Sequence, residues 1–377
     1  MRVRLEWVTL FAFASFGLLQ KSVGFEGCFI YLILCIFIFW YLQKPIGLHF
    51  LSSHQFWLLP LGGLLLVAAY IIFKIKFPHW ESKVDRNEAL DLAVHQILQG
   101  SYPYDVKTQL NNPLSPFPGA IFLAFPFVLL GSSSYQNFFW LIVLLLWMRE
   151  RIQGLAVLGF LITLGISLPF LQEWLFGGDL IANNIYVLIA VLGLLHFGKK
   201  DSQYRNNLLL WGMTIFFGMT LSSRPNFIFW FPIVFVYLAR TRGWSWSLRH
   251  AVVTAIVMLA VTLPFWLYAP SKFSPLHAAK KIEVSFVWSS YLIIGLMVGF
   301  TGLGLRRCRN FIACLGWGAL IQAIPVICIV LLDSFQSLTF DFSFTKERYG
   351  LNFVIPGCVW FWYKLNNNTK QNHSSTT

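Results

Sequence analysis

The sequence has little charge. Only 11% of its 377 residues are Asp, Glu, Lys or Arg, whereas 57% are hydrophobic. A water-soluble domain carries charge on about a quarter of its residues, and its core could not enclose this much apolar side chain. The composition therefore excludes an ordinary soluble globular protein. It predicts an all-α, polytopic membrane protein in which lipid surrounds much of the surface.

Acidic residues are the scarcer of the charged types, 15 against 28 basic ones, and the formal net charge is +13. In a soluble protein this excess would indicate a nucleic-acid partner. Here the basic residues stand in short clusters between apolar runs, which is the distribution of cytoplasmic loops in membrane proteins. We therefore predict no nucleic-acid partner. The clusters expected to face the cytoplasm are Arg2/Arg4, Lys44, Lys199/Lys200/Arg205, Arg240/Arg242/Arg249, Arg306/Arg307/Arg309 and Lys364.

Cysteine spacing of the metal-binding kind is absent. The six cysteines lie in or beside apolar runs, and we interpret them as small buried hydrophobic residues. We also find no fixed-period repeat and no soluble domain. The sequence predicts one membrane domain over residues 1–365, followed by a disordered polar tail over 366–377.

Apolar runs separated by short loops predict about 11–13 membrane segments. The first, MRVRLEWVTLFAFASFGLLQK, lacks a clear cleavage site and is expected to be a retained short membrane helix. Counting segments from the basic clusters gives a conflict between residues 116 and 185, because Arg149 and Arg151 require the cytoplasmic side. One of three runs is therefore expected not to cross fully, and the sequence leaves the choice open: 116–131, 135–148 or 154–172.

The longest polar interruption spans residues 74–115 and is expected to face away from the cytoplasm. It holds five of the fifteen acidic residues, namely Glu81, Asp85, Glu88, Asp91 and Asp105. Long loops with structure of their own are usually functional. Within the loop, DRNEALDLAVHQILQG has apolar residues near one face and ends in Gly100. It predicts an amphipathic helix on the outer membrane surface, with Asp85 as its N-cap.

The acidic residues of this helix are candidates for general-base chemistry. Asp85 ranks first. In general, a carboxylate near lipid becomes a stronger base because it is less solvated, and neighbouring cations keep it ionised. The alternative is a purely capping role. Asp91 lies six residues further on and is the second candidate, while Glu88 lies between them and would support either. No cofactor is predicted; a divalent ion held by Asp85 with Asp91 or Glu88 remains an open alternative.

The order of these features resembles a known family. The outer-loop Asp is followed by an Ala-rich helix, the turn GSYPY, the entry SPFPG and a run ending in PFVLLG. Two later segments, FGGDLIANNIYVLIAVLGLLHFGKK and SSRPNFIFWFPIVFVYLARTRGW, extend the likeness. Together they resemble the integral-membrane glycosyltransferases of the GT-C superfamily. They are most like the polyprenyl-phosphate-mannose-using branch, which includes the family 87 enzymes and the catalytic subunit of GPI mannosyltransferase I. The resemblance covers most of residues 80–245. It departs from the family at Arg86-Asn87-Glu88, where an aromatic is frequent, and at Asp179, where the family has Gln.

The resemblance implies a GT-C-like fold and a specific reaction. A mannose-like hexose would pass from a polyprenyl-phosphate donor to a lipid-linked or glycan acceptor on the non-cytoplasmic face, with inversion. Asp85 matches the loop aspartate that deprotonates the acceptor hydroxyl. One base and a cationic pocket suffice chemically, because a lipid phosphate leaves as a stabilised anion. The expected location is the plasma membrane of a bacterium, as part of its cell envelope, or the endoplasmic reticulum of a eukaryote.

Several residues are candidates for binding the substrates. Arg224 and Arg348 rank first for the donor phosphate, since a guanidinium group suits bidentate contact, and Lys280/Lys281 follow. The alternatives are arginines that reach lipid headgroups and a solvated lysine pair. Tyr104, in the turn after the loop helix, is also assigned to the substrate site. Asp179 and Asn184 follow Gly177-Gly178 and would either line that site or cap a helix.

Two other classes compete with a glycosyltransferase. O-antigen polymerases and ligases are also many-helix proteins, but they usually carry their large polar loops in the second half of the chain. A transporter or flippase more often has charges at mid-membrane in broken helices and two related halves. The acidic outer loop in the first third of this chain favours the transferase.

Overall fold

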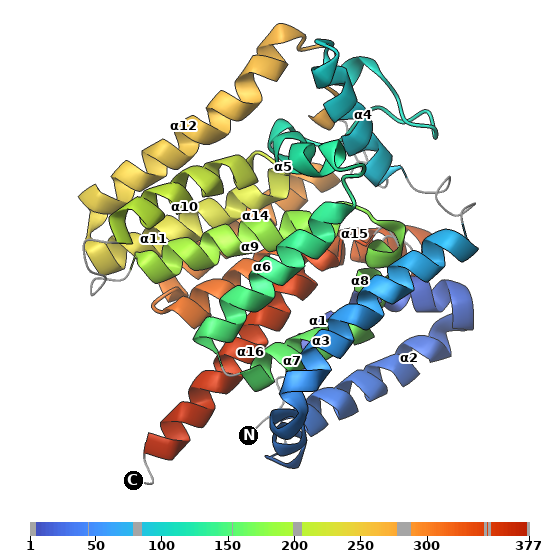
Figure 1. The fold of residues 1–377 in the computed structure, drawn as a ribbon, viewed down its shortest axis with the longest axis vertical. Coiled ribbons are helices and arrows are strands. Elements are labelled where there is room, and N and C mark those ends of the chain that lie inside the picture. The colour runs from blue at the N-terminus through green and yellow to red at the C-terminus, as the bar shows by residue number, and fades with distance from the viewer. Residues whose placement is uncertain are drawn as a thin grey trace.

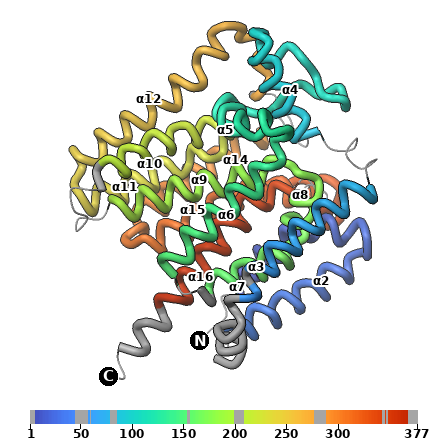
Figure 2. Tube along the Cα trace, viewed as in Figure 1, coloured from blue at the N-terminus to red at the C-terminus, as the bar shows by residue number. Residues whose placement is uncertain are grey.

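The computed structural model describes residues 5–43, 45–77, 85–152, 154–198, 206–276, 288–342, 345 and 348–374 (Figures 1 and 2). Within these ranges the chain is helical and has no β-strand, only one isolated bridge between Lys107 and Pro113. The all-α prediction is confirmed.

The elements are α1 (Leu5–Phe13), α2 (Phe16–Leu42), α3 (Pro45–Lys76), α4 (Arg86–Leu98), η2 (Pro103–Asp105), α5 (Pro118–Leu129), α6 (Tyr135–Arg151), α7 (Gly154–Ile166), α8 (Leu168–Phe176), α9 (Leu180–Phe197), α10 (Asn206–Leu221), η3 (Pro225–Phe229), α11 (Trp230–Arg242), α12 (Trp244–Tyr268), η4 (Ser274–Leu276), α14 (Ser289–Arg307), α15 (Phe311–Ser337) and α16 (Leu351–Ser374).

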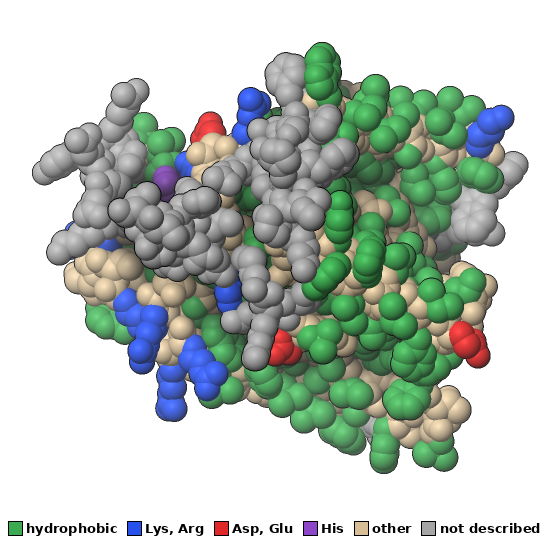
Figure 3. Space-filling model, turned by 90° about the horizontal axis from the view of Figure 1, so that it is seen from below, with side chains coloured by type: hydrophobic (Ala, Val, Ile, Leu, Met, Phe, Trp, Pro, Cys, Tyr) green, Lys and Arg blue, Asp and Glu red, His purple; other side chains and the backbone are tan. Residues whose placement is uncertain are grey.

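Several helices are able to cross a membrane. Among the described residues, five are long and apolar enough, namely α2, α9, α12, α14 and α15, and the pair α7–α8, bent by 81°, would make a sixth. Helices α6, α10 and α11 have 17, 16 and 13 residues and are too short to qualify. The membrane prediction is supported, although fewer segments qualify by length than the predicted number. Seen from below, hydrophobic side chains cover a large part of the face and Lys and Arg gather at one side (Figure 3).

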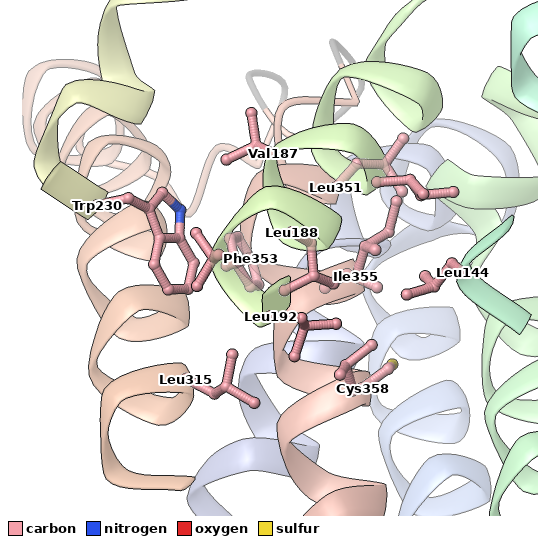
Figure 4. Packing of buried hydrophobic residues seen from close by; sticks show 14 of the residues in the cluster. Leu144, Val187, Leu188, Leu192, Trp230, Leu315, Leu351, Phe353, Ile355 and Cys358 are labelled. Carbon is pink, nitrogen blue, oxygen red and sulfur yellow. The ribbon is translucent and has the colours of Figure 1, made fainter. Parts of the chain in front are cut away.

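Helix α9 forms the centre of the bundle. Its sequence is apolar on every side, a pattern typical of a helix that is surrounded by others. It contacts α6, α10, α11 and α16, and its side chains are buried from Leu180 to Leu195. Figure 4 shows Val187, Leu188 and Leu192 among residues of the neighbouring helices, including Trp230, Leu315 and Phe353. The buried start of α9 is the point around which the charged site is built.

The first membrane segment is divided differently from the sequence prediction. Helix α1 has only nine residues, and α2 is broken at Gly24, whose φ of 78° lies in the left-handed region. Phe11 packs against Phe39, with ring centroids 5.2 Å apart, and Ser15 Oγ donates to Tyr31 Oη over 3.2 Å. The second part of α2 therefore runs back beside α1, and Gly24 supplies the turn because it has no side chain.

Helix α5 lies within the region where the segment count conflicts. Its start is fixed by the Gly119 amide, which donates to the carbonyl of Ser222 over 3.0 Å. Just after its end, the Ser133 amide donates to Asp91 on α4 over 2.8 Å. Both ends of α5 thus lie at the end of the bundle that carries α4, while α6 leads away to Arg149 and Arg151 (Figure 1). Of the three runs, 116–131 thus forms a helix of 12 residues that begins and ends at the α4 end of the bundle.

The predicted loop helix is present as α4, and its apolar face packs on protein. Ala89, Leu90, Ala93 and Val94 are buried in a cluster with α5, Tyr102, Tyr104 and Phe273. The sequence predicts a lipid-facing side made of Ala89, Leu92, Ala93, Gln96 and Ile97, so the buried face is rotated toward Leu90 and Val94. Helix α4 is therefore held as a cover on the end of the bundle.

The chain end also differs from the expected disordered tail over 366–377. Helix α16 continues to Ser374, and Asn366 is buried. The polar residues extend the last helix because nothing in them, neither Gly nor Pro, stops it.

A close contact between α7 and α16 predicts a stability effect. A Cβ added at Gly159 would lie 2.1 Å from the Trp362 ring, whereas one added at Gly165 on the same helix would meet nothing within 4 Å. Gly159→Ala is expected to cost about 1–3 kcal/mol through overpacking. Gly165→Ala, as the matched control, should keep or slightly raise stability through helix propensity. Thermal unfolding of the purified protein in detergent measures both; equal midpoints would contradict the packing.

Candidate functional site

A buried carboxylate, Glu173, forms one half of a charged site at the α4 end of the bundle. It lies on α8, is fully buried, and its Oε2 atom is 3.1 Å from Arg348 Nη1. Arg348 is 6% exposed and has a φ of 64°, a left-handed conformation that is uncommon outside glycine. A buried charge of this kind requires a partner, and each of these residues provides one for the other.

The other half is the pair of Asp179 and Arg224. Arg224 Nη2 donates to both carboxylate oxygens of Asp179, over 2.8 and 2.7 Å. Asn183 Nδ2 donates to Oδ2 over 2.7 Å, and the Tyr186 hydroxyl donates to Asn183 Oδ1. Burial raises the pKa of Asp179, but the charges of Arg224 and Arg86 and these hydrogen bonds outweigh it, so the net pKa is lowered. Asp179 is thus held as a carboxylate.

The two halves meet at the start of α9. Glu173 Oε1 accepts a hydrogen bond from the Leu180 amide over 3.0 Å, and Asn137 Oδ1 accepts one from the Ala182 amide over 3.0 Å. These acceptors satisfy amides that the helix leaves free, and the carboxylate suits the positive end of the helix dipole. A Cβ at Gly178 would lie 2.2 Å from Glu173 Oε1. Gly178 is therefore needed for this close approach.

Arg86 connects the cover helix α4 to this site. Its Nη1 atom lies 3.8 Å from Glu173 Oε2, and its guanidinium lies over the ring of Tyr349, 5.1 Å from the centroid. Its charge also acts on Asp179. Three arginines from distant parts of the chain, Arg86, Arg224 and Arg348, thus surround two buried carboxylates.

Asp85 precedes Arg86 and is half-buried. Although it stands at the N-cap position, its side chain makes no capping hydrogen bond, so the expected cap is wrong. Instead its Oδ2 atom accepts hydrogen bonds from Thr108 Oγ1 and Asn112 Nδ2, both over 2.8 Å. These bonds fix one carboxylate oxygen. Among the described residues, none donates to the other oxygen, Oδ1.

Asp91 and Glu88 are engaged by the backbone. The Ser133 amide donates to Asp91 Oδ1 over 2.8 Å, and the Gln109 amide donates to Glu88 Oε1 over 2.9 Å. Both contacts hold α4 to neighbouring loops. Asp91 is thus bound to the segment before α6, whereas Asp85 is bound to the loop at Thr108 and Asn112.

Replacement of Asp91 by Asn predicts a change in pH dependence. Burial raises the pKa of Asp91 above its ordinary 3.8. The folded state then binds a proton that the unfolded state has already lost, so stability falls as pH rises from 3.8 through the raised pKa. Asp91→Asn removes this slope and retains an acceptor for Ser133, and the variant should be at least as stable at neutral pH. Unfolding midpoints across this range measure the effect; an unchanged slope would contradict it.

The remaining predicted site residues lie in different places. Tyr104 is buried in the cluster beneath α4, where its hydroxyl donates to the Pro116 carbonyl over 2.9 Å; it supports the loop and is not brought to the charged site. Asn184 donates to Asn352 Oδ1 over 3.0 Å and so joins α9 to α16 near the site. Lys280 and Lys281 lie outside the described residues.

Glu173 and Arg86 were not selected from the sequence. Glu173 is a single acid at the end of an apolar run, and an ionisable residue in such a place is by default a functional candidate. The sequence alone therefore indicates Glu173 as a candidate. Arg86 stands among other charges of the loop, and nothing in its spacing indicates that it turns inward.

The chemistry of the site depends on charge. Among the described residues, no group of three or more His, Cys, Asp or Glu side chains is placed to hold a metal ion. Three guanidinium groups against two carboxylates leave one positive charge in the buried part of the site.

No family model, curated protein or solved structure matches this chain.

Proposed function

We propose that the chain is a GT-C-like membrane glycosyltransferase with about 11–13 membrane segments. It would transfer a mannose-like hexose from a polyprenyl-phosphate donor to a lipid-linked or glycan acceptor at the α4 end of the bundle. This end is the non-cytoplasmic one, because the opposite end carries the basic clusters around Arg151, Arg240 and Arg307.

The convergence of Arg86, Arg224 and Arg348 on Glu173 and Asp179 carries the proposal. Buried charges in a membrane protein are costly, and they usually mark a substrate site. The excess of positive charge suits an anionic phosphate. The carboxylates hold the guanidinium groups in place before the donor arrives, which is the preorganisation that stabilises a leaving group efficiently.

Asp85 supplies the base. Its Oδ1 atom takes the proton of the acceptor hydroxyl as that oxygen attacks the anomeric carbon from the side opposite the phosphate. The bond from the anomeric carbon to the phosphate oxygen breaks, and the phosphate leaves with the electron pair. Thr108 and Asn112 orient the carboxylate through Oδ2. One base suffices, since the leaving phosphate needs no proton.

One observation favours a transporter as the second candidate. Helix α8, which follows the 81° break after α7, carries a buried charge, Glu173, and broken helices with charges are frequent at transport sites. In a transporter these groups would bind a substrate that leaves chemically unchanged.

A transfer assay separates the two candidates. Membranes containing the protein are supplied with a polyprenyl-phosphate mannose labelled in the sugar, together with extracted lipid acceptors. The transferase predicts label in a new glycosidic product, and membranes lacking the protein give the background. Label that moves across sealed vesicles without a new product would establish the transporter.

A further inference from the structure

A large cavity lies at the opposite end of the molecule from α4. It has a volume of about 750 Å³, opens to the molecular surface, and is lined by α1, the end of α14, the start of α15 and α16. Its lining residues are Glu6, Trp7, Leu10, Arg307, Asn310, Phe311, Ile312, Ala313, Gly316, Trp317, Ala319, Leu320, Trp360, Lys364 and Asn367. None of these residues belongs to the charged site around Glu173, so the cavity needs its own explanation.

One part of the lining is cationic. The guanidinium of Arg307 lies over Trp317 at 5.9 Å, and Lys364 Nζ lies over Trp360 at 5.4 Å. Both tryptophans line the cavity, so the two cations are held at it by cation–π contacts. The first turn of α15 adds the positive end of a helix dipole. Glu6 is the single acid in the lining.

The other part is apolar and contains an unsatisfied donor. Leu10, Trp317, Ala319 and Leu320 supply hydrocarbon and ring surface. Trp7 is 6% exposed, and its indole N–H has no hydrogen-bond acceptor among the described residues. A buried N–H without an acceptor costs free energy. This nitrogen is shut off from the cavity space, so Trp7 offers a ligand only the apolar surface of its ring.

We propose that this cavity binds one anionic phospholipid of the cytoplasmic leaflet. The headgroup phosphate lies between Arg307 and Lys364, near the start of α15. An acyl chain covers Leu10, Trp317 and Leu320. The combination of charge and apolar lining selects a lipid over a free anion, which would leave the apolar part unfilled. The basic clusters place this end of the bundle at the leaflet that is rich in anionic lipid.

Lipid titration of the purified protein, read by native mass spectrometry, tests the proposal. Phosphatidylglycerol and phosphatidylcholine with identical acyl chains are compared. The wild type is expected to retain one phosphatidylglycerol per chain with about tenfold preference over phosphatidylcholine. Arg307→Gln with Lys364→Gln should weaken phosphatidylglycerol about tenfold, which abolishes the preference, and leave phosphatidylcholine unchanged. Ala313→Trp, which fills the cavity, should weaken both lipids.

The matched control is Arg306→Gln with Arg309→Gln, which removes two charges from the same region but none from the lining. It should change phosphatidylglycerol binding less than about threefold. If both double variants lose phosphatidylglycerol affinity equally, general surface charge explains the binding and the proposal is overturned. Equal binding of the two lipids would also overturn it, as would displacement of phosphatidylglycerol by excess inorganic phosphate, since that would show a site for a free anion. An unchanged phosphatidylcholine affinity in the charge variants shows that they remain folded.

Discussion

Replacement of Asp85 by Asn is expected to lower the rate of sugar transfer by about 10²–10⁴-fold, the usual contribution of a general base. Asn has nearly the shape of Asp, and its carbonyl oxygen can still accept from Thr108 and Asn112, which donate to Asp85 over 2.8 Å. The loop therefore keeps its position, and the change removes only the ability to take a proton. The loss should appear in kcat, with the KM for the donor nearly unchanged.

The transfer assay with labelled polyprenyl-phosphate mannose measures this effect, and Asp91→Asn is the matched control. Both acids belong to the same short segment, but Asp91 is engaged by the Ser133 amide. Asp91→Asn should transfer sugar within about threefold of the wild type, because a surviving hydrogen bond keeps the anchor. Loss of transfer in Asp91→Asn with retention in Asp85→Asn would assign the base to Asp91. Full transfer by both variants would show that neither acid acts as the base.

The sequence predicts those parts of the protein whose structure is determined by the local pattern of residues. The acid-rich helix is present because its apolar spacing and Gly100 define it without reference to the remaining chain. Asp179 and Arg224 were both expected near a substrate site, and the structure joins them directly. Each stands at the break between two apolar runs, where an isolated charge is informative by itself.

Other features depend on contacts between distant segments, which a single sequence does not give. The 12 residues of α5 are as apolar as a membrane span, and only the hydrogen bonds at its two ends show that both lie at the end of the bundle that carries α4. Arg348 was expected at the donor phosphate, and its partner Glu173 lies far away along the chain. The rotated face of α4 follows from its packing on α5, because protein and lipid select the same apolar side chains.

The pair of Glu173 and Arg348 leads to the second large prediction. Glu173→Gln keeps an oxygen that can accept from the Leu180 amide, now 3.0 Å from Glu173 Oε1, but it removes the negative charge. Arg348 would then be a buried cation next to a second cation, Arg86, at the same place. Loss of one partner of a buried ion pair costs about 3–5 kcal/mol. The thermal unfolding midpoint of the protein in detergent should therefore fall strongly, more than for Gly159→Ala.

A second change should restore part of this loss and thereby identify its cause. In Glu173→Gln with Arg348→Gln both charges of the pair are absent, and two amides can hydrogen-bond across the former 3.1 Å contact. We expect the double variant to be more stable than Glu173→Gln alone, with a coupling of about 1–3 kcal/mol, the range for residues in direct contact. Additive losses would mean that Glu173 acts mainly as an acceptor for α9 and that its charge is compensated elsewhere. A positive coupling would show that the carboxylate and Arg348 stabilise each other directly, which is the contact on which the proposed phosphate site depends.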